Sequence, residues 1–219
     1  MRRRRADRAS GSATALGGNG LLATLDDRWE NRVVPFVYHL CAEDFRGTHL
    51  LPLNTLRVVH PDVYDRERTK WTGRESVLQW QVPHLGVAWG DTVNLSALDP
   101  VQLVRARKRL GVPSSHLLQR RVARIPVDRI AHRAAVIYDS RSHWLNSRPG
   151  ETVRSSPPED EFTPFDADTY EELLDTPRLH PEYLSEQLSA GQPALGFVFV
   201  RHVLVAGPVD ISGLPLERL

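Results

Sequence analysis

The fold is decided by a strand that runs directly into a helix, in the stretch Trp89-Gly90-Asp91-Thr92-Val93-Asn94-Leu95-Ser96-Ala97-Leu98-Asp99-Pro100. Its aromatic and β-branched side chains fit a pleated surface, which predicts a strand over Trp89–Leu95. Asp99 can accept hydrogen bonds from the amides of a first helical turn, and Pro100 suits the first helical position. We therefore expect a helix over Asp99–Leu110, which Gly111 ends in a left-handed conformation.

The strands expected on either side of this stretch are not separated by regular helices. The first is a buried strand over Val33–Leu40, and two middle strands follow over Arg121–Pro126 and Ala134–Tyr138. A late strand rich in Val and Phe is expected over Ala194–Ala206, and a short returning strand over Val209–Ile211. Glu67–Trp80 is compatible with a helix that Gly73 weakens, and further helices are expected from Asp166 or Asp168 to Leu174 and over His180–Ala190. Because helices and strands do not alternate, the pattern predicts an α+β fold.

Composition places the chain among soluble globular proteins. Of its 219 residues, 41% are hydrophobic and 25% are charged, which is enough apolar surface for one core. The single cysteine, Cys41, rules out an internal disulfide framework and suits a reducing cytoplasm, the expected location. No apolar run reaches the roughly 20 residues of a membrane helix. We expect a basic, Gly-rich and disordered tail over residues 1–27 and one α+β domain over 28–219.

Charge is segregated along the chain. Val101–Arg133 contains nine Lys or Arg and one acidic residue, whereas Glu159–Glu182 contains nine Asp or Glu and one basic residue. The two segments either pair with each other in the fold, which we favour, or leave the basic one free for an anionic partner such as nucleic acid.

His39, Asn94 and Ser96 are candidate site residues on expected strands. A neutral imidazole on a buried strand can donate one hydrogen bond and accept another, which suits a hydrogen bond to a sugar hydroxyl. Ser96 and Asn94 lie where a strand leads into a helix, a common place for ligand contacts. The alternatives are a core histidine satisfied by the backbone and a simple turn serine.

An insert between these strands combines aromatic and charged side chains. Its members are Tyr64, Arg66, Arg68, Trp71, Arg74 and Glu75. Such a mixture can stack on a base or a nicotinamide ring and pair with phosphate. The alternative is a solvated helix with spaced ion pairs, in which Arg66 and Lys70 flank Glu67.

Other site types find less support. His39 and Cys41 share a strand face, but no further zinc-ligand motif follows them. A nucleophilic Cys41 or Ser96 would need a histidine base, and no nucleophile elbow is present. The sequence also contains neither a Rossmann fingerprint nor a phosphate-binding loop.

The order of these features resembles the ADP-ribosyltransferase superfamily, particularly the bacterial toxins that modify DNA bases. The resemblance is carried by Val37-Tyr38-His39-Leu40 at the start, by the Arg-bearing insert and the strand at Gly90–Ser96, and by the β-rich segment from Val198 to Val209. It extends over most of residues 35–211 as a pattern of elements. It implies a single α+β domain with a split, antiparallel or mixed sheet at its core and peripheral helices.

The resemblance also implies an NAD site in a cleft of the split sheet. His39 would hydrogen-bond the nicotinamide ribose, Asn94 or Ser96 would line the cleft, and Tyr64 or Trp71 would stack on nicotinamide. An acidic residue would stabilise the developing oxocarbenium charge. Glu75 is the best candidate for that acid, ahead of Asp210 and Glu217, and it departs from the family pattern because it is not on a late strand.

Three hypotheses follow for function. The first is an NAD-dependent ADP-ribosyltransferase acting on a nucleic acid or a protein, with His39 and Glu75 as its catalytic residues, NAD as co-substrate and no metal. The alternative is a non-enzymatic module that binds nucleic acid or nucleotide through its basic segment. The third is a small hydrolase that uses Ser96 or Cys41.

Overall fold

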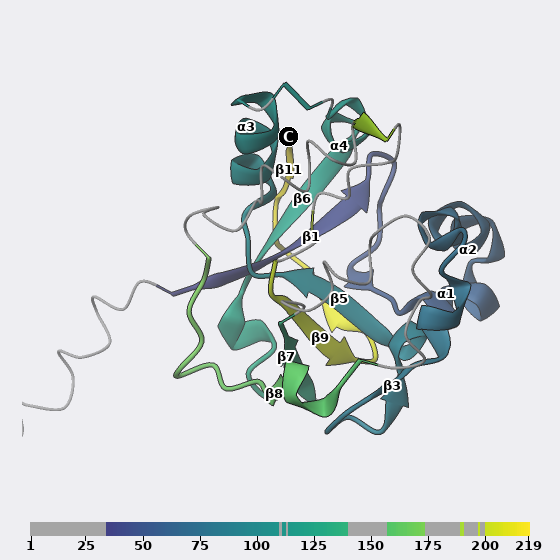
Figure 1. Cartoon of the computed structure of the whole chain (residues 1–219), viewed down its shortest axis with the longest axis vertical. Helices are drawn as coiled ribbons and strands as arrows, with labels where there is room; N and C mark the ends of the chain where they lie inside the picture. The colour runs from purple at the N-terminus through teal and green to yellow at the C-terminus, as the bar shows by residue number, and fades with distance from the viewer. Residues whose placement is uncertain are drawn as a thin grey trace, which may run out of the picture. The chain divides into compact units, whose positions relative to one another are not determined.

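The computed structural model describes residues 34–109, 111–112, 114–139, 157–173, 189–190, 197 and 200–219. Its core is a seven-stranded sheet in the order β11-β6-β1-β5-β9-β7-β8, in which every neighbouring pair is antiparallel. The strands are β1 (Phe36–Ala42), β5 (Thr92–Ser96), β6 (Arg120–Pro126), β7 (Ala135–Tyr138), β8 (Phe162–Pro164), β9 (His202–Ala206) and β11 (Leu216–Arg218) (Figure 1).

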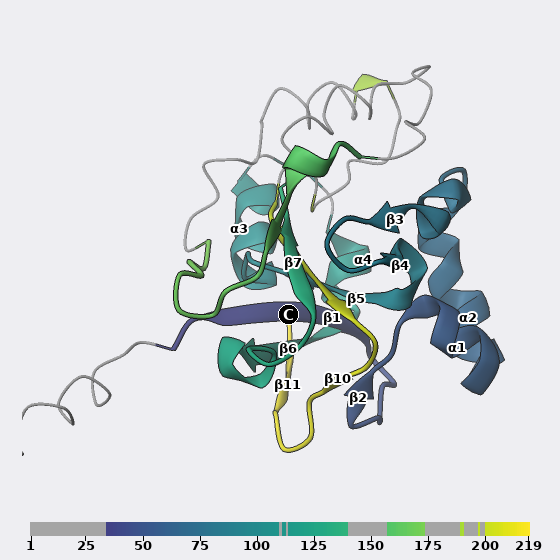
Figure 2. The same ribbon diagram turned by 90° about the horizontal axis from the view of Figure 1, so that it is seen from below.

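The sheet is split between β1 and β5. β1 pairs with β6 along its whole length, from Phe36 opposite Pro126 to Ala42 opposite Arg120. In contrast, β1 pairs with β5 only at Tyr38 opposite Ser96. Beyond that point the two strands separate, and β1 and β6 run at a steep angle to β7 and β9 (Figure 2).

Segment Tyr170–Leu173 closes the split on the side of the β1 N-terminus. Glu172 accepts a hydrogen bond from the amide of Phe36 (3.0 Å) and another from the hydroxyl of Tyr38. The amide of Leu173 donates to the carbonyl oxygen of Ala97 (2.9 Å). At this end the two halves of the sheet are therefore tied together by a third segment, in addition to their own pairing at Tyr38 and Ser96.

Helices cover the sheet at two places. α3 (Pro100–Arg109) packs its apolar face, with the fully buried Leu103, into a cluster with Leu98 and Val112, and is followed by the short α4 (Ser115–Leu118). α1 (Leu53–Val59) and α2 (Pro61–Arg68) lie beside the split, before the 3₁₀ turns at Thr69–Trp71 and Glu75–Gln79. Two small antiparallel strand pairs complete the fold: β2 (His49–Leu50) with β10 (Val209–Asp210), and β3 (Gln81–Val82) with β4 (Val87–Ala88). A third 3₁₀ turn, Trp89–Asp91, follows β4.

The predicted α+β class is confirmed, and so are most of the predicted strands. The first strand, both middle strands and the return after Gly207 are present within a few residues of their expected bounds, and β9 forms the end of the late strand. The helix expected at Asp99–Leu110 is α3, and the carboxylate of Asp99 accepts a hydrogen bond from the amide of Val101 (2.8 Å), as its capping role requires.

Three expected elements differ. The strand expected from Trp89 begins only at Thr92, because Trp89–Asp91 forms a 3₁₀ turn. The helix considered for Glu67–Trp80 is broken, since Gly73 takes a left-handed conformation (φ 77°) between two 3₁₀ turns. No helix forms over residues 166–173: the side chain of Asp166 accepts hydrogen bonds from the amide of Asp168 and the hydroxyl of Thr169 and makes a local turn instead.

Several other expectations lie outside the described residues. They are the tail over 1–27, most of the helix at His180–Ala190, and residues 194–196, 198 and 199 of the late strand. The described residues Phe197, Val200 and Arg201 are not in a strand, so the late strand begins only at His202. The described residues from Val34 onward belong to one compact unit, Val34–Leu219.

The start of α1 is held against the turn before β5. The side-chain amide of Asn54 donates to Asp91 (2.8 Å), and a Cβ atom built on Gly90 would lie 2.9 Å from that amide group. We expect Gly90→Ala to displace the side chain of Asn54 and to lower the free energy of unfolding by about 1 kcal/mol. Asn54→Ala, which removes the same hydrogen bond directly, should lower it by a similar amount. Urea unfolding of both variants measures this.

The double variant tests whether the two residues act through one contact. Gly90→Ala with Asn54→Ala should cost no more than Asn54→Ala alone, because the side chain that the new Cβ displaces is gone. Strictly additive losses would contradict this account of how α1 is attached.

Candidate functional site

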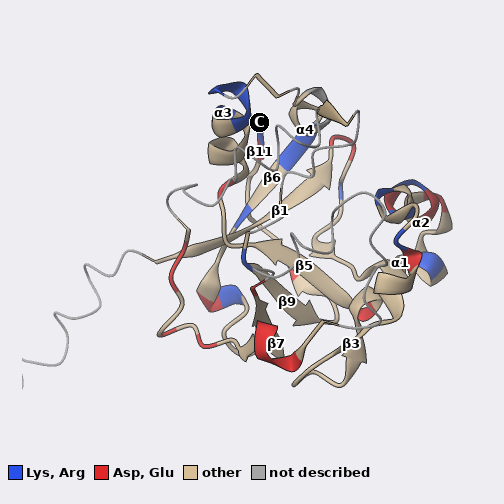
Figure 3. Cartoon of the chain, in the orientation of Figure 1, with Lys and Arg blue, Asp and Glu red and all other residues tan. Residues whose placement is uncertain are grey.

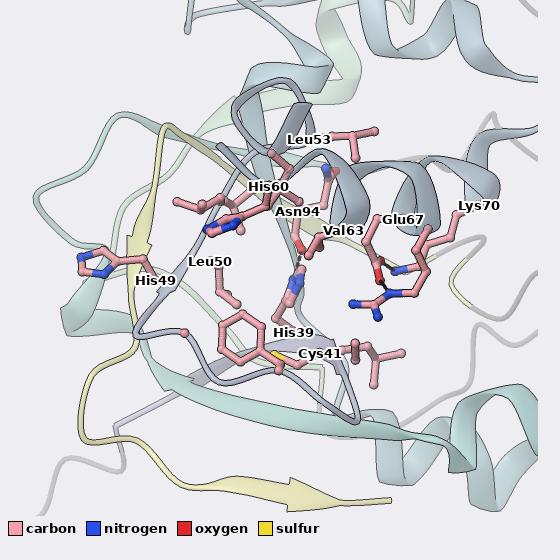
Figure 4. A pocket seen from close by; sticks show the side chains of 18 of the residues that line it. His39, Cys41, His49, Leu50, Leu53, His60, Val63, Glu67, Lys70 and Asn94 are labelled. Carbon is pink, nitrogen blue, oxygen red and sulfur yellow. Dashed lines mark hydrogen bonds and ion pairs between the residues drawn. The ribbon is translucent and has the colours of Figure 1, made fainter. Parts of the chain in front are cut away.

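A cavity of about 460 Å³ lies at the split, between β1 and β5 on one side and α1 and α2 on the other. Its lining includes His39 and Cys41 from β1, Asn94 from β5, and Leu53 and Glu67 from the two helices (Figure 4). A volume of this size is typical of small-molecule sites. The pocket exists because β1 and β5 separate after a single paired position.

His39 bridges the two halves of the sheet with its side chain. Its Nδ1 lies 2.9 Å from the main-chain oxygen of Asn94, where the backbone ladder between β1 and β5 has ended. A carbonyl oxygen only accepts, so Nδ1 carries the proton and Nε2 keeps a lone pair that can accept a hydrogen bond. The site therefore offers a ligand one neutral imidazole acceptor in a fixed orientation.

The pocket keeps His39 neutral. Burial lowers the pKa of His39 to about 4, and the nearby cations Lys70 and Arg120 act in the same direction, against the hydrogen bond to Asn94 and the charge of Glu67. At neutral pH the ring is uncharged and can accept a proton or a hydrogen bond.

Two carboxylates line this pocket, the exposed Asp44 and the more buried Glu67. The side chain of Glu67 is 17% exposed and is surrounded by three cations: Lys70, Arg120 (3.2 Å) and Arg66 (3.7 Å). Burial alone would raise the pKa of Glu67, but the charges and hydrogen bonds of Lys70 and Arg120 outweigh it and hold that pKa below its ordinary value. Glu67 is therefore ionised at neutral pH, with more positive than negative charge around it.

Cys41 lies on the same face of β1 as His39 and is 3% exposed. Burial raises the pKa of its thiol to about 11. A thiol in this state is a poor nucleophile at neutral pH, because the thiolate is the reactive form. The hydrolase hypothesis therefore loses one of its two nucleophiles.

The pocket unites three of the residues expected from the sequence: His39, Trp71 and Asn94. Trp71 lies in the 3₁₀ turn after α2, with the guanidinium of Arg74 5.6 Å from its ring. Among the lining residues, Trp71 offers an aromatic face, as a stacking partner requires.

The other three expected residues are not in the pocket lining. The hydroxyl of Ser96 is buried and makes a local turn, donating to the carbonyl of Leu98 and accepting from its amide, which is the structural role considered for it. Tyr64 is on α2 but outside the lining. Glu75 is exposed, and its carboxylate accepts a hydrogen bond from the amide of Gly73 (3.0 Å), so the geometry offers no support for it as the acid of this site.

Sequence reasoning placed Glu67 in an ion pair and missed it as a site residue. One signal was present: Val63, Glu67 and Lys70 have the four- and three-residue spacing of one helix face. All three line the pocket, with Val63 and Glu67 on α2 and Lys70 in the 3₁₀ turn that follows. The partner Arg120 lies 53 residues away in sequence, on β6. No local pattern could have brought it to Glu67.

The exposed cations of the basic segment are distributed over several elements of the described residues. They are found at the end of α3 (Arg105, Lys108, Arg109), on β6 (Arg124) and after β6 (Arg129, Arg133) (Figure 3). The ion pairs of this segment include Arg120 with Glu67 and Arg129 with Asp210 (3.8 Å), both with carboxylates outside the acidic stretch Glu159–Glu182.

Two kinds of feature are absent from the described residues. No helix there is long and apolar enough to cross a membrane. No group of three or more His, Cys, Asp or Glu side chains in the same residues is arranged to hold a metal ion.

Comparisons of the chain with protein-family models, with curated proteins and with solved structures gave no match.

Protonation of His39 should make stability depend on pH. The folded pKa of His39 is about 4 and its ordinary value is 6.5, so between these values the unfolded state binds more protons. The free energy of unfolding should therefore fall as the pH drops from 6.5 to 4. Urea unfolding at four pH values in this window measures the slope.

His39→Gln should flatten that slope, because glutamine does not titrate. His202, whose pKa burial also lowers, supplies a second contribution, so the slope should be reduced rather than abolished. Equal slopes for the wild type and His39→Gln would show that His39 is not held neutral by the fold.

Proposed function

We propose that this protein is an NAD-dependent ADP-ribosyltransferase-like enzyme whose active site is the pocket at the split of the sheet. The observation that carries the proposal is the position of His39 in the split, where it lines one pocket together with an ionised carboxylate, Glu67. The sequence resemblance supplied His39 for the same role, and the pocket supplies a carboxylate in place of Glu75.

The pocket offers the groups that binding NAD requires. The Nε2 atom of His39 can accept a hydrogen bond from a hydroxyl of the nicotinamide ribose, while Trp71 can stack on the nicotinamide ring. Arg66 and Lys70 also line the pocket and can pair with the pyrophosphate. In this proposal the nicotinamide ribose end of the dinucleotide binds in the cavity of about 460 Å³ at the split.

The proposed reaction breaks the bond between C1′ of the ribose and the nicotinamide nitrogen. The electron pair of that bond goes to nicotinamide, which leaves as a neutral molecule, and positive charge develops on the ribose. The carboxylate of Glu67 stabilises that charge when Arg66 and Lys70 pair with the pyrophosphate instead of with Glu67. An oxygen or nitrogen of the target then bonds to C1′ and releases its proton to solvent.

The target in this proposal is a macromolecule, a nucleic acid or a protein. The excess of positive charge around Glu67 favours an anionic ligand at the pocket mouth, which suits the co-substrate in either case. We further propose a cytoplasmic location, because the buried free thiol of Cys41 needs no oxidising compartment.

Nicotinamide release from NAD by the full chain tests the proposal. Wild-type protein should release nicotinamide, and addition of the target should raise the rate. His39→Ala and Glu67→Gln should each lower the rate by at least 100-fold, the order of effect seen when a preorganised electrostatic group is removed. Melting temperatures should show that both variants fold.

Glu75→Gln is the matched control. It removes the same kind of charge from the same insert, but outside the pocket, and should leave the rate within about twofold of wild type. Loss of activity in Glu75→Gln with full activity in Glu67→Gln would reverse our assignment of the acid. No release by the folded wild type under any condition, together with salt-sensitive nucleic-acid binding, would favour the non-enzymatic module.

A further inference from the structure

The two oxygens of the Glu67 carboxylate have different partners. Oε1 lies 3.2 Å from a guanidinium nitrogen of Arg120 and 3.7 Å from Nε of Arg66, whereas Oε2 is paired with Lys70. Glu67 and Lys70 face each other at the pocket (Figure 4). A ligand that takes the partner of one oxygen therefore leaves the other oxygen still held.

The three cations differ in whether a ligand can reach them. Arg66 and Lys70 line the pocket at the split, and both side chains are about half exposed. Arg120 is not among the lining residues, and its side chain is 24% exposed. An anionic ligand in the pocket can therefore pair with Arg66 and Lys70, while Arg120 stays with Glu67.

Arg120 is anchored on the sheet. It is the first residue of β6 and lies opposite Ala42, at the end of the continuous pairing between β1 and β6. Lys70, in contrast, is in the 3₁₀ turn after α2 and only three residues from Glu67. The contact with Arg120 thus fixes the carboxylate relative to β1, the strand that carries His39.

We infer that Arg120 is a positioning residue, which holds Oε1 of Glu67 in place and leaves Oε2 free for the ribose once Lys70 pairs with the pyrophosphate. The inference rests on the proposed function, in which Glu67 stabilises the charge that develops on the ribose. Lys70 is then the exchangeable partner of Glu67, and Arg120 is the permanent one.

Nicotinamide release by the full chain tests this through its dependence on pH. The charge and hydrogen bond of Arg120 help to lower the pKa of Glu67. Arg120→Met should therefore raise that pKa and move the acidic limb of kcat/KM up by about one pH unit, the usual effect of losing an opposite charge.

The kinetic constants at neutral pH give a second readout. Arg120→Met should lower kcat about tenfold and leave KM for NAD within about twofold, because Arg120 does not face the ligand. Lys70→Met should show the opposite split, a raised KM for NAD, because Lys70 binds the pyrophosphate.

Two further variants separate positioning from support of the fold. Arg120→Lys keeps the charge and should restore most of the acidic limb. Arg124→Met is the matched control: it removes a cation from the same strand, whose guanidinium lies 3.7 Å from the ring centre of Phe36, and should leave the pH profile unchanged. A lower melting temperature of Arg120→Met with an unmoved acidic limb would overturn the inference.

The outcomes also separate the inference from the function on which it rests. If the wild type releases nicotinamide and folded Arg120→Met has the same pH profile and kcat, the role of Arg120 is wrong and the proposed function stands. If the folded wild type releases none, the proposed function is wrong and the inference falls with it.

A measurement on the wild type covers the case in which Arg120→Met does not fold. The NMR signals of Lys70 Cε and Arg120 Nε, assigned with Lys70→Arg and Arg120→Lys, are followed while carbocyclic NAD is added, whose nicotinamide bond is not cleaved. The Lys70 signal should move as its partner changes, and the Arg120 signal should stay in place. An Arg120 signal that moves as far as that of Lys70, or a Lys70 signal that does not move at saturation, would overturn the inference.

Discussion

The hydrogen bond from His39 to the main-chain oxygen of Asn94 is the contact on which the site depends. β1 and β5 share one paired position, and beyond it their main chains separate and no longer form hydrogen bonds with each other. The His39 side chain spans part of that gap: its Nδ1 donates a hydrogen bond to β5, while its Nε2 stays available to a ligand. Because the bond fixes which nitrogen carries the proton, it also decides that the site presents an acceptor.

The opposite wall of the pocket is built differently from the sheet. No residue of α1 or α2 is buried, although Leu53, Leu56 and Val63 of these helices line the cavity. The helices are held at their margins by polar contacts: Asn54 with Asp91, Glu67 with Arg120, and Arg66 with Asp44 (2.9 Å). The same carboxylate that we propose for catalysis thus helps to position the wall that carries it.

The sequence predicted the strands well because their signals are local. Apolar runs such as Val33–Leu40 and a capped helix start at Asp99 need no knowledge of distant residues, and β1, β5 and α3 appear where those signals lie. The site was only partly predictable. His39, Asn94 and Trp71 were chosen for their chemistry and their order along the chain, and the fold brings all three to one pocket.

Glu67 could not be identified in this way, because its environment is made by long-range contacts. The depressed pKa of Glu67 requires Arg120, which only the pairing of β6 with β1 delivers. Ser96 and Glu75 show the converse, since each is satisfied by neighbours within two residues and is drawn away from the pocket.

A crystal structure of the protein with carbocyclic NAD bound would test the central claim most directly. The account predicts the nicotinamide ribose in the pocket at the split, with a ribose hydroxyl within hydrogen-bond distance of His39 Nε2 and the ring against Trp71. Dinucleotide bound elsewhere on the protein, with the pocket at His39 empty, would contradict it.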